Sequence, residues 1–243
     1  MVSTLFTEAN VTVPGPAALA HVTVTGAELY LSAASWSFEA DTQVTGFTFD
    51  AVGDQASRVG SGVLHKYAGR TLLVATGSCA VHCRYCFRRH FPYAEESAAA
   101  GRWEPALAQL ASDSSVSELI LSGGDPLSLS NERLGELLRR LPDIGHLRTL
   151  RIHTRLPVVL PERIDAGLAE LLDALPLRTV VVVHANHGNE IDAGVAAAFA
   201  RLRATGATLL NQSVLLRGVN DDADTLATLS ERLFDAGALP YYL

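Results

Sequence analysis

Apolar and polar residues alternate in two periods along most of this chain. From about residue 70 onward, short runs of β-branched and apolar residues predict strands at 71 to 76, 118 to 122, 149 to 154, 179 to 184 and 207 to 213. Longer stretches with helical periodicity predict helices near 104 to 112, 131 to 141, 162 to 174, 190 to 205 and 222 to 236. This alternation is typical of repeated βα units with a parallel sheet, and Gly206 stands where a helix should end.

The segment P-Y-Y-L at 240 to 243 looks like a sixth strand that has just begun, so we expect the chain to stop inside an element. Residues 1 to 44 follow a different pattern, with β-like alternation in V-T-V-T-G and E-L-Y-L-S. They could be an extra strand or hairpin, a packing arm, or a wrongly placed start. We therefore expect an N-terminal segment of unclear role at 1 to 44 and one main domain at 45 to 243.

Polar residues stand at the end of each expected strand. They are Thr76 to Cys79, Ser122 to Asp125, His153 to Arg155, His184 to Asn186, and Asn211 to Ser213. Because sites in parallel βα architectures are built at the carboxyl edge of the sheet, these residues are the first candidates for function.

Composition narrows the class of protein. The 243 residues are 48% hydrophobic and 19% charged, with a net charge of -7, which gives no general attraction to nucleic acid or to an anionic membrane. No leader-like or membrane-spanning apolar run is present, so we expect a cytoplasmic protein. Of the 19 basic residues only Lys66 is a lysine, so any chemistry that needs a lysine has one candidate in this chain.

All three cysteines, Cys79, Cys83 and Cys86, lie in the run C-A-V-H-C-R-Y-C directly after the first expected strand of the series. An odd number of cysteines so close together is a poor disulfide framework and a good metal site. Three thiolates can hold a [4Fe-4S] cluster and leave one iron open to another ligand. The alternatives are a zinc site completed by His82 or His90, or three ordinary buried cysteines.

Several longer motifs match one family in order and spacing. They are C-R-Y-C-F-R-R-H-F-P-Y (83 to 93), L-S-G-G-D-P-L (121 to 127), R-I-H-T-R-L-P-V-V-L-P-E-R-I (151 to 164), H-A-N-H-G-N-E (184 to 190) and N-Q-S-V-L-L-R-G-V-N-D (211 to 221). From about residue 45 onward the chain thus resembles the radical S-adenosylmethionine (SAM) enzymes of the lysine 2,3-aminomutase family. F-R-R-H-F-P-Y and H-K-Y-A-G-R (65 to 70) look most like the branch that makes β-lysine for elongation factor P.

The resemblance implies an α/β fold, the partial (β/α)6 barrel of radical SAM enzymes, here cut short at about the sixth strand. It implies that the open iron of the cluster chelates SAM and that Gly123, Gly124 and Asp125 hold the SAM amino group. Without the resemblance, G-G-D-P is only a turn. Glycine does allow the backbone to approach a ligand closely.

The resemblance also assigns one basic residue. Arg88 stands where the family binds the carboxylate of substrate lysine, and an arginine fork suits that task, although most Arg-Arg pairs are solvated. The role of Arg89, as a substrate ligand or a surface residue, stays open.

Other polar residues at the strand ends are candidates because of their chemistry. Arg151 and Arg155 flank His153, and one of the two arginines could be a surface residue. His184, Asn186 and His187 are expected to line the barrel mouth, with a satisfied core histidine as the alternative. Asn211, Gln212 and Ser213 are candidates for the ribose or carboxylate of SAM.

Pyridoxal phosphate (PLP) is the second cofactor that the resemblance implies. It places Lys66 and Arg70 near the PLP phosphate, whereas the family's PLP lysine lies beyond 240 to 243. We therefore expect this chain to be a fragment or truncated form whose own activity is doubtful.

Three functions stay open at this stage. The first is an aminomutase that makes β-lysine for elongation factor P and its ligase, with flavodoxin or ferredoxin as electron donor. The second is a free-lysine aminomutase of metabolism, and the third is a non-catalytic metal-binding domain. No nucleic acid or membrane partner is expected.

Overall fold

The computed structural model describes residues 19–24, 27–32, 50, 52–88, 91–93 and 103–242. The chain divides into two compact units, one made of residues 1–57 and 81–92 and the other of residues 58–80 and 93–243. The expected boundary between 44 and 45 falls outside the described residues, as do Arg89 and His90.

The larger unit contains a mixed sheet of eight strands in the order β10-β9-β8-β7-β6-β5-β4-β3. Its strands are β3 (Arg58–Gly60), β4 (Val63–Tyr67), β5 (Arg70–Thr76), β6 (Glu118–Gly123), β7 (Thr149–Thr154), β8 (Arg178–His184), β9 (Thr208–Gln212) and β10 (Leu239–Tyr242). The six strands from β5 to β10 run parallel and follow chain order, whereas β3, β4 and β5 are antiparallel neighbours. Six parallel strands in chain order confirm the expected α/β fold with a partial (β/α)6 barrel.

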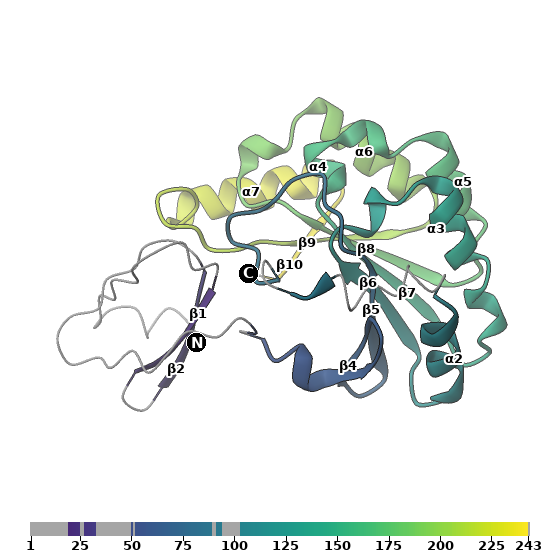
Figure 1. Cartoon of the computed structure of the whole chain (residues 1–243). Helices are drawn as coiled ribbons and strands as arrows, with labels where there is room; N and C mark the ends of the chain where they lie inside the picture. The colour runs from purple at the N-terminus through teal and green to yellow at the C-terminus, as the bar shows by residue number, and fades with distance from the viewer. Residues whose placement is uncertain are drawn as a thin grey trace. The chain divides into compact units, whose positions relative to one another are not determined.

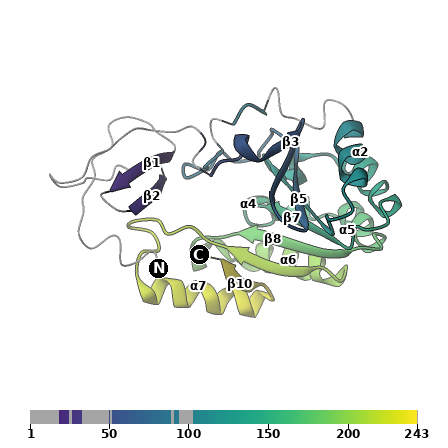
Figure 2. The same cartoon turned by 90° about the horizontal axis from the view of Figure 1, so that it is seen from below.

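The helices follow the strands. They are α2 (Glu104–Ser112), α3 (Asn131–Leu138), α4 (Leu156–Val159), α5 (Ala166–Asp173), α6 (Ala193–Ala204) and α7 (Ala223–Ala236). They cover one face of the sheet, and the second view shows α6 and α7 lying along the strands β8 to β10 (Figures 1 and 2). No helix in the described part of the chain is long and apolar enough to cross a membrane.

Two helices begin later than their periodicity predicts. The helix expected at 162 begins at Ala166, because the carboxylate of Asp165 accepts a hydrogen bond from the Leu168 N–H at 2.7 Å. The helix expected at 190 begins after Asp192, which caps the Val195 N–H at 2.9 Å. These N-cap aspartates set the helix starts more strongly than the apolar pattern does. Gly206, with φ of 77°, ends α6 as expected.

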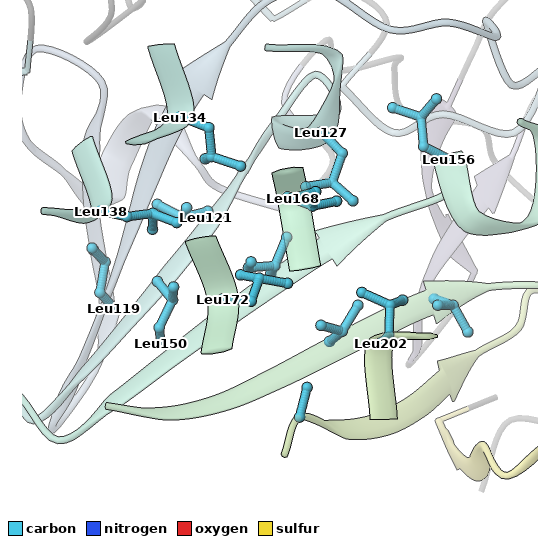
Figure 3. Close-up of a cluster of buried hydrophobic side chains, with 14 of the residues drawn as sticks. Leu119, Leu121, Leu127, Leu134, Leu138, Leu150, Leu156, Leu168, Leu172 and Leu202 are labelled. Atoms are coloured by element: carbon cyan, nitrogen blue, oxygen red, sulfur yellow. The ribbon is translucent and has the colours of Figure 1, made fainter. Parts of the chain in front are cut away.

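A leucine-rich core fills the space between the sheet and its helices. Leu121 and Leu150 of the sheet and Leu134 and Leu168 of the helices are all fully buried, and the close-up shows them facing one another (Figure 3). Burying such side chains stabilises the fold by about 2 kcal/mol each. Because the core covers one face of the sheet, the alternate side chains of the same strands point to the other face.

The smaller unit contains the hairpin β1 (Leu19–Val24) and β2 (Ala27–Ser32), paired antiparallel from Val24 and Ala27 outward. The role of residues 1 to 44 stays a prediction, since only these two strands of the segment are described. The remaining residues before 50 lie outside the described part.

Candidate functional site

The carboxyl edge of the parallel strands collects the polar residues that the sequence singled out. β5 ends at Thr76, β6 at Gly123, β7 at Thr154, β8 at His184 and β9 at Gln212. The ladder pairs Thr76 with Gly123 and His184 with Gln212, so these strand ends are neighbours along one edge. The expected clustering at this edge is present in the larger unit.

Two glycines form a tight cradle at the end of β6. Gly123 has φ of 110°, and a Cβ placed there would lie 2.8 Å from the Thr76 carbonyl oxygen. A Cβ at Gly124 would lie 2.8 Å from the Ser78 nitrogen. Only glycine fits either position without displacing backbone, because real Cβ atoms do not approach other atoms so closely. The Gly124 N–H donates to the Thr76 carbonyl at 2.7 Å, which fixes the cradle against the segment that leads to Cys79.

Hydrogen bonds of Tyr93 and Asp125 fix the cradle. The Tyr93 hydroxyl donates to the Gly123 carbonyl at 2.7 Å. Asp125 Oδ1 accepts hydrogen bonds from the Thr154 hydroxyl at 2.7 Å and the Leu127 N–H at 3.0 Å, and its Oδ2 accepts one from the Arg155 N–H at 2.7 Å. Burial raises the pKa of Asp125 above its usual range, although these donors pull the pKa the other way. The geometry gives Asp125 the task of fixing the loop.

His184 and His153 lie on the sheet face that the leucine core leaves uncovered. Their rings meet edge to face with centroids 5.9 Å apart. His184 Nε2 is buried and has no hydrogen-bond partner among the described residues. Burial, with a smaller contribution from the nearby charge of Arg155, lowers the pKa of His184 to about 4. His184 is therefore neutral at physiological pH, and its Nε2 can bond a polar ligand atom.

Arg70 and Arg151 lie nearer the amino end of the same face. Arg151 Nε donates to Glu118 Oε1 at 2.6 Å, and Arg70 Nε lies 3.7 Å from Glu118 Oε2. Burial lowers the pKa of the Arg151 guanidinium, but Glu118 and the Tyr241 hydroxyl outweigh this effect and raise it. Two guanidinium groups that share one carboxylate leave a net positive charge here, which suits an anionic ligand.

The structure separates these basic residues from the glycine cradle. Arg70 is the first residue of β5 and Thr76 the last, so the two ends of the strand lie roughly 20 Å apart. Lys66 is exposed on β4, which runs antiparallel to β5. Lys66 and Arg70 thus cannot touch the same part of a small ligand as Gly123 and Gly124.

The smaller unit contains Cys83, Cys86 and Arg88. Arg88 is buried, and its Nε donates to Asp54 Oδ2 at 2.8 Å. The Asp50 carboxylate accepts the N–H groups of Asp54 and Gln55 at 2.7 and 2.8 Å and so fixes the loop that carries Asp54. Asp54 therefore fixes the guanidinium of Arg88, which is not a solvated surface side chain.

None of the three cysteines is in a disulfide, and each is partly exposed. Within the described residues, no three His, Cys, Asp or Glu side chains form a group that could hold a metal ion. Cys79, Cys83 and Cys86 as cluster ligands therefore stay a prediction from their spacing and chemistry. Thiolate sites commonly reach their final geometry only when the metal binds, because binding and folding are coupled.

Several site residues were missed by sequence reasoning. Asp54, Tyr93, Glu118 and Glu190 each bind a predicted residue or its neighbour from far along the chain. For Asp54, the separation is 34 residues. No periodicity or short motif links such positions, so only the fold could reveal them.

The chain matches one family model and is similar to several known proteins. Residues 60–152, which include all three cysteines and both cradle glycines, match the family model described as "4Fe-4S single cluster domain". The chain is 51% identical over 201 residues to the L-lysine 2,3-aminomutase of Haemophilus influenzae, covering 83% of this chain and 60% of that protein. It is 52% identical over 198 residues to the L-lysine 2,3-aminomutase of Escherichia coli, covering 82% and 58%.

A more distant L-lysine 2,3-aminomutase, from Clostridium subterminale, is 37% identical over 183 residues, covering 75% of this chain and 44% of that protein. The chain thus spans about three-fifths or less of the length of these curated relatives. Among solved structures, a radical SAM methyltransferase from Sphaerobacter thermophilus aligns with a TM-score of 0.45 and 19% identity, covering 74% of this chain and 57% of that one.

Proposed function

We propose, on the premise that the chain is a homologue of the radical SAM L-lysine 2,3-aminomutases, that it carries the SAM-binding part of an enzyme that converts L-lysine to β-lysine. The observation that carries the proposal is the glycine cradle at the end of β6, bonded to the segment that leads from β5 into the C-x3-C-x2-C loop. The matched cluster domain supports a [4Fe-4S] cluster, and the resemblance of the motifs to radical SAM enzymes supports SAM as its partner.

We assign the cluster to Cys79, Cys83 and Cys86, because three thiolates are the donor set that such a cluster takes. Gly123 and Gly124 would let the SAM amino group approach backbone carbonyls, and Gln212 and the neutral His184 would bond other polar atoms of SAM. Asp125 fixes this loop through its hydrogen bonds to Thr154 and Arg155. When bound, the cluster and SAM supply a 5′-deoxyadenosyl radical.

For the substrate we assign Arg88 to the lysine carboxylate. Asp54 orients the guanidinium through Nε, and a planar fork can then bind a carboxylate in bidentate fashion. The buried position of Arg88 strengthens that bond, because a charge pair gains energy where water is excluded.

PLP is the cofactor that we propose for the basic group at the amino end of the strands. Arg70 and Arg151 fit a phosphate, since among the described residues these two guanidinium groups share one carboxylate partner, Glu118. The exposed Lys66 on β4 adds another positive charge to this region of the sheet. When bound, PLP supplies the carbonyl group that activates the substrate amine.

The physiological role that we favour is β-lysine supply for elongation factor P, with a flavodoxin or ferredoxin as electron donor. The motif F-R-R-H-F-P-Y supports this role over free-lysine metabolism. A non-catalytic metal-binding domain is not favoured, because neither the glycine cradle nor a buried Arg88 fixed by Asp54 would have a function in such a domain.

The proposal is tested by incubating the anaerobically reconstituted, reduced chain with SAM, PLP and lysine deuterated at the β-carbon. We expect deuterium to appear in 5′-deoxyadenosine, measured by mass spectrometry. Formation of 5′-deoxyadenosine without deuterium would support SAM cleavage and contradict lysine as the substrate. Coupling the product to the elongation factor P ligase would then separate the two physiological roles.

A further inference from the structure

Hydrogen bonds connect the loops at the carboxyl edge of the sheet into one continuous network. The Asp125 carboxylate, at the end of β6, accepts the Arg155 N–H at 2.7 Å, in the loop after β7. Arg155 Nη2 donates in turn to Glu190 Oε2 at 2.8 Å, in the segment after β8. Two steps thus join three successive strand ends.

The network continues from Glu190 to the loop after β9. Glu190 Oε1 accepts the N–H groups of Asn186 and His187 at 2.7 and 3.0 Å. Asn186 Oδ1 accepts the Val214 N–H at 2.8 Å, and Asn220 Nδ2 donates to the carbonyls of Asn186 and Val214 at 2.7 and 3.0 Å. The strand-end network therefore consists of Asp125, Arg155, Glu190, Asn186, Val214 and Asn220.

Because these residues are buried, breaking their hydrogen bonds would cost free energy. Asp125, Asn186 and Asn220 are 7%, 3% and 0% exposed, so few of their lost hydrogen bonds could be replaced by water. A buried donor or acceptor left without a partner costs about 1 to 3 kcal/mol. The network is thus expected to move as a unit, because loosening one bond exposes the next to that cost.

Glu190 connects the two parts of the strand-end network. Its two carboxylate oxygens serve different loops, one the Arg155 side chain after β7 and the other the backbone of Asn186 and His187. The ion pair with Arg155 is partly exposed, at 21% and 24%, and such a pair alone would stabilise little. Here one partner is already fixed by two backbone donors, so less conformational entropy is lost when the pair forms.

We propose that Glu190 is a positioning residue, which fixes the glycine cradle relative to the strand ends at His184 and Gln212. This inference rests on the proposed function, since these two ends are the groups assigned to SAM. Asp125 follows Gly124 directly, and Asn186 lies two residues after His184. A shift at Glu190 therefore reaches both sides of the SAM site although Glu190 touches neither.

The test compares Glu190→Gln with a matched control in the full chain. Gln keeps the size and one acceptor oxygen, but its amide N–H2 would face either Arg155 or the backbone donors. The control is Glu104→Gln, which removes the charge from a more exposed arginine pair, with Arg140 at 2.6 Å, on α2 away from the edge. Two quantities are measured, residue-resolved amide hydrogen exchange and the Kd for SAM with the cluster kept oxidised, so that SAM is not cleaved.

Glu190→Gln should speed exchange at the backbone N–H groups of Arg155 and Val214, which bond Asp125 and Asn186 and not Glu190, and should weaken SAM binding about tenfold. Glu104→Gln should change neither quantity. A merely local role would alter exchange only at Asn186 and His187, and that result overturns the proposal.

An unchanged Kd for SAM in Glu190→Gln overturns the positioning role alone, whereas a wild-type chain that binds no SAM overturns the proposed function and the positioning role together. If Glu190→Gln does not fold, Glu190→Asp replaces it, because the shorter side chain keeps the charge but cannot reach both loops. Glu190→Asp with wild-type exchange and wild-type affinity would equally reject the proposal.

Discussion

Protonation of His184 should oppose folding, because the native state holds this ring neutral. Nε2 is buried without a hydrogen-bond partner among the described residues, and the Arg155 cation lies nearby. These features lower the pKa of His184 from 6.5 to about 4. Between these two values the unfolded chain binds a proton that the native chain does not, so stability is present above pH 6.5 and is lost as the pH falls toward 4.

The magnitude follows from the two pKa values. At pH 7.5 the histidine is neutral in both states and contributes almost nothing to the pH dependence. At pH 5.0 it is mostly protonated in the unfolded chain and mostly neutral in the native one, which removes about 2 kcal/mol of the free energy of unfolding. For a domain of ordinary stability this is a measurable fraction of the total.

Urea unfolding at pH 7.5 and 5.0 measures the effect, with wild type and His184→Gln compared at both values. Other groups titrate in both proteins, so the difference between their pH dependences isolates His184. We expect wild type to lose about 2 kcal/mol more than the variant on acidification. His82→Gln, at an exposed histidine, serves as the control. Equal pH dependence in wild type and His184→Gln would refute the reasoning.

Three further changes test the site. In Gly124→Ala the new Cβ would lie 2.8 Å from the Ser78 nitrogen, so SAM binding should fall at least about tenfold by calorimetry, and wild-type affinity would contradict the cradle. Asp125→Asn turns an N–H2 group toward buried donors and should destabilise the fold by about 2 to 4 kcal/mol in urea, and a loss below 1 kcal/mol would mean that these bonds contribute little. Arg88→Lys loses the Nε bond to Asp54 and should weaken L-lysine binding about tenfold at unchanged iron content, and unchanged binding would remove Arg88 from the site.

Much of the fold could be predicted because each parallel strand is a nearly continuous apolar run. The predicted strand 149 to 154 coincides with β7, and the predicted helix 104 to 112 coincides with α2. β3 and β4 were missed, because they are short, half exposed and without a clear period. Helix starts were displaced where an aspartate N-cap, such as Asp165, lies inside an apolar pattern.

The site was predictable only where it is local in sequence. The glycine cradle and the strand-end residues could be found because a motif and a strand end are short-range signals. Glu118, Asp54 and Glu190 could not, since each acts on a residue that only the fold brings near. Sequence spacing therefore indicates which groups bind a ligand, whereas the partners that hold those groups in place follow from tertiary structure.

The most direct test of the account is the electron paramagnetic resonance spectrum of the reconstituted and reduced chain, recorded with and without SAM. Cys79, Cys83 and Cys86 should hold one [4Fe-4S] cluster, with about four irons and a matching amount of sulfide per chain. The open iron should make the spectrum change when SAM is added, and Cys83→Ala should abolish both signal and change. A chain that instead retains one tightly bound zinc and takes up no sulfide, or a cluster spectrum that SAM leaves unaltered, would contradict the radical SAM assignment.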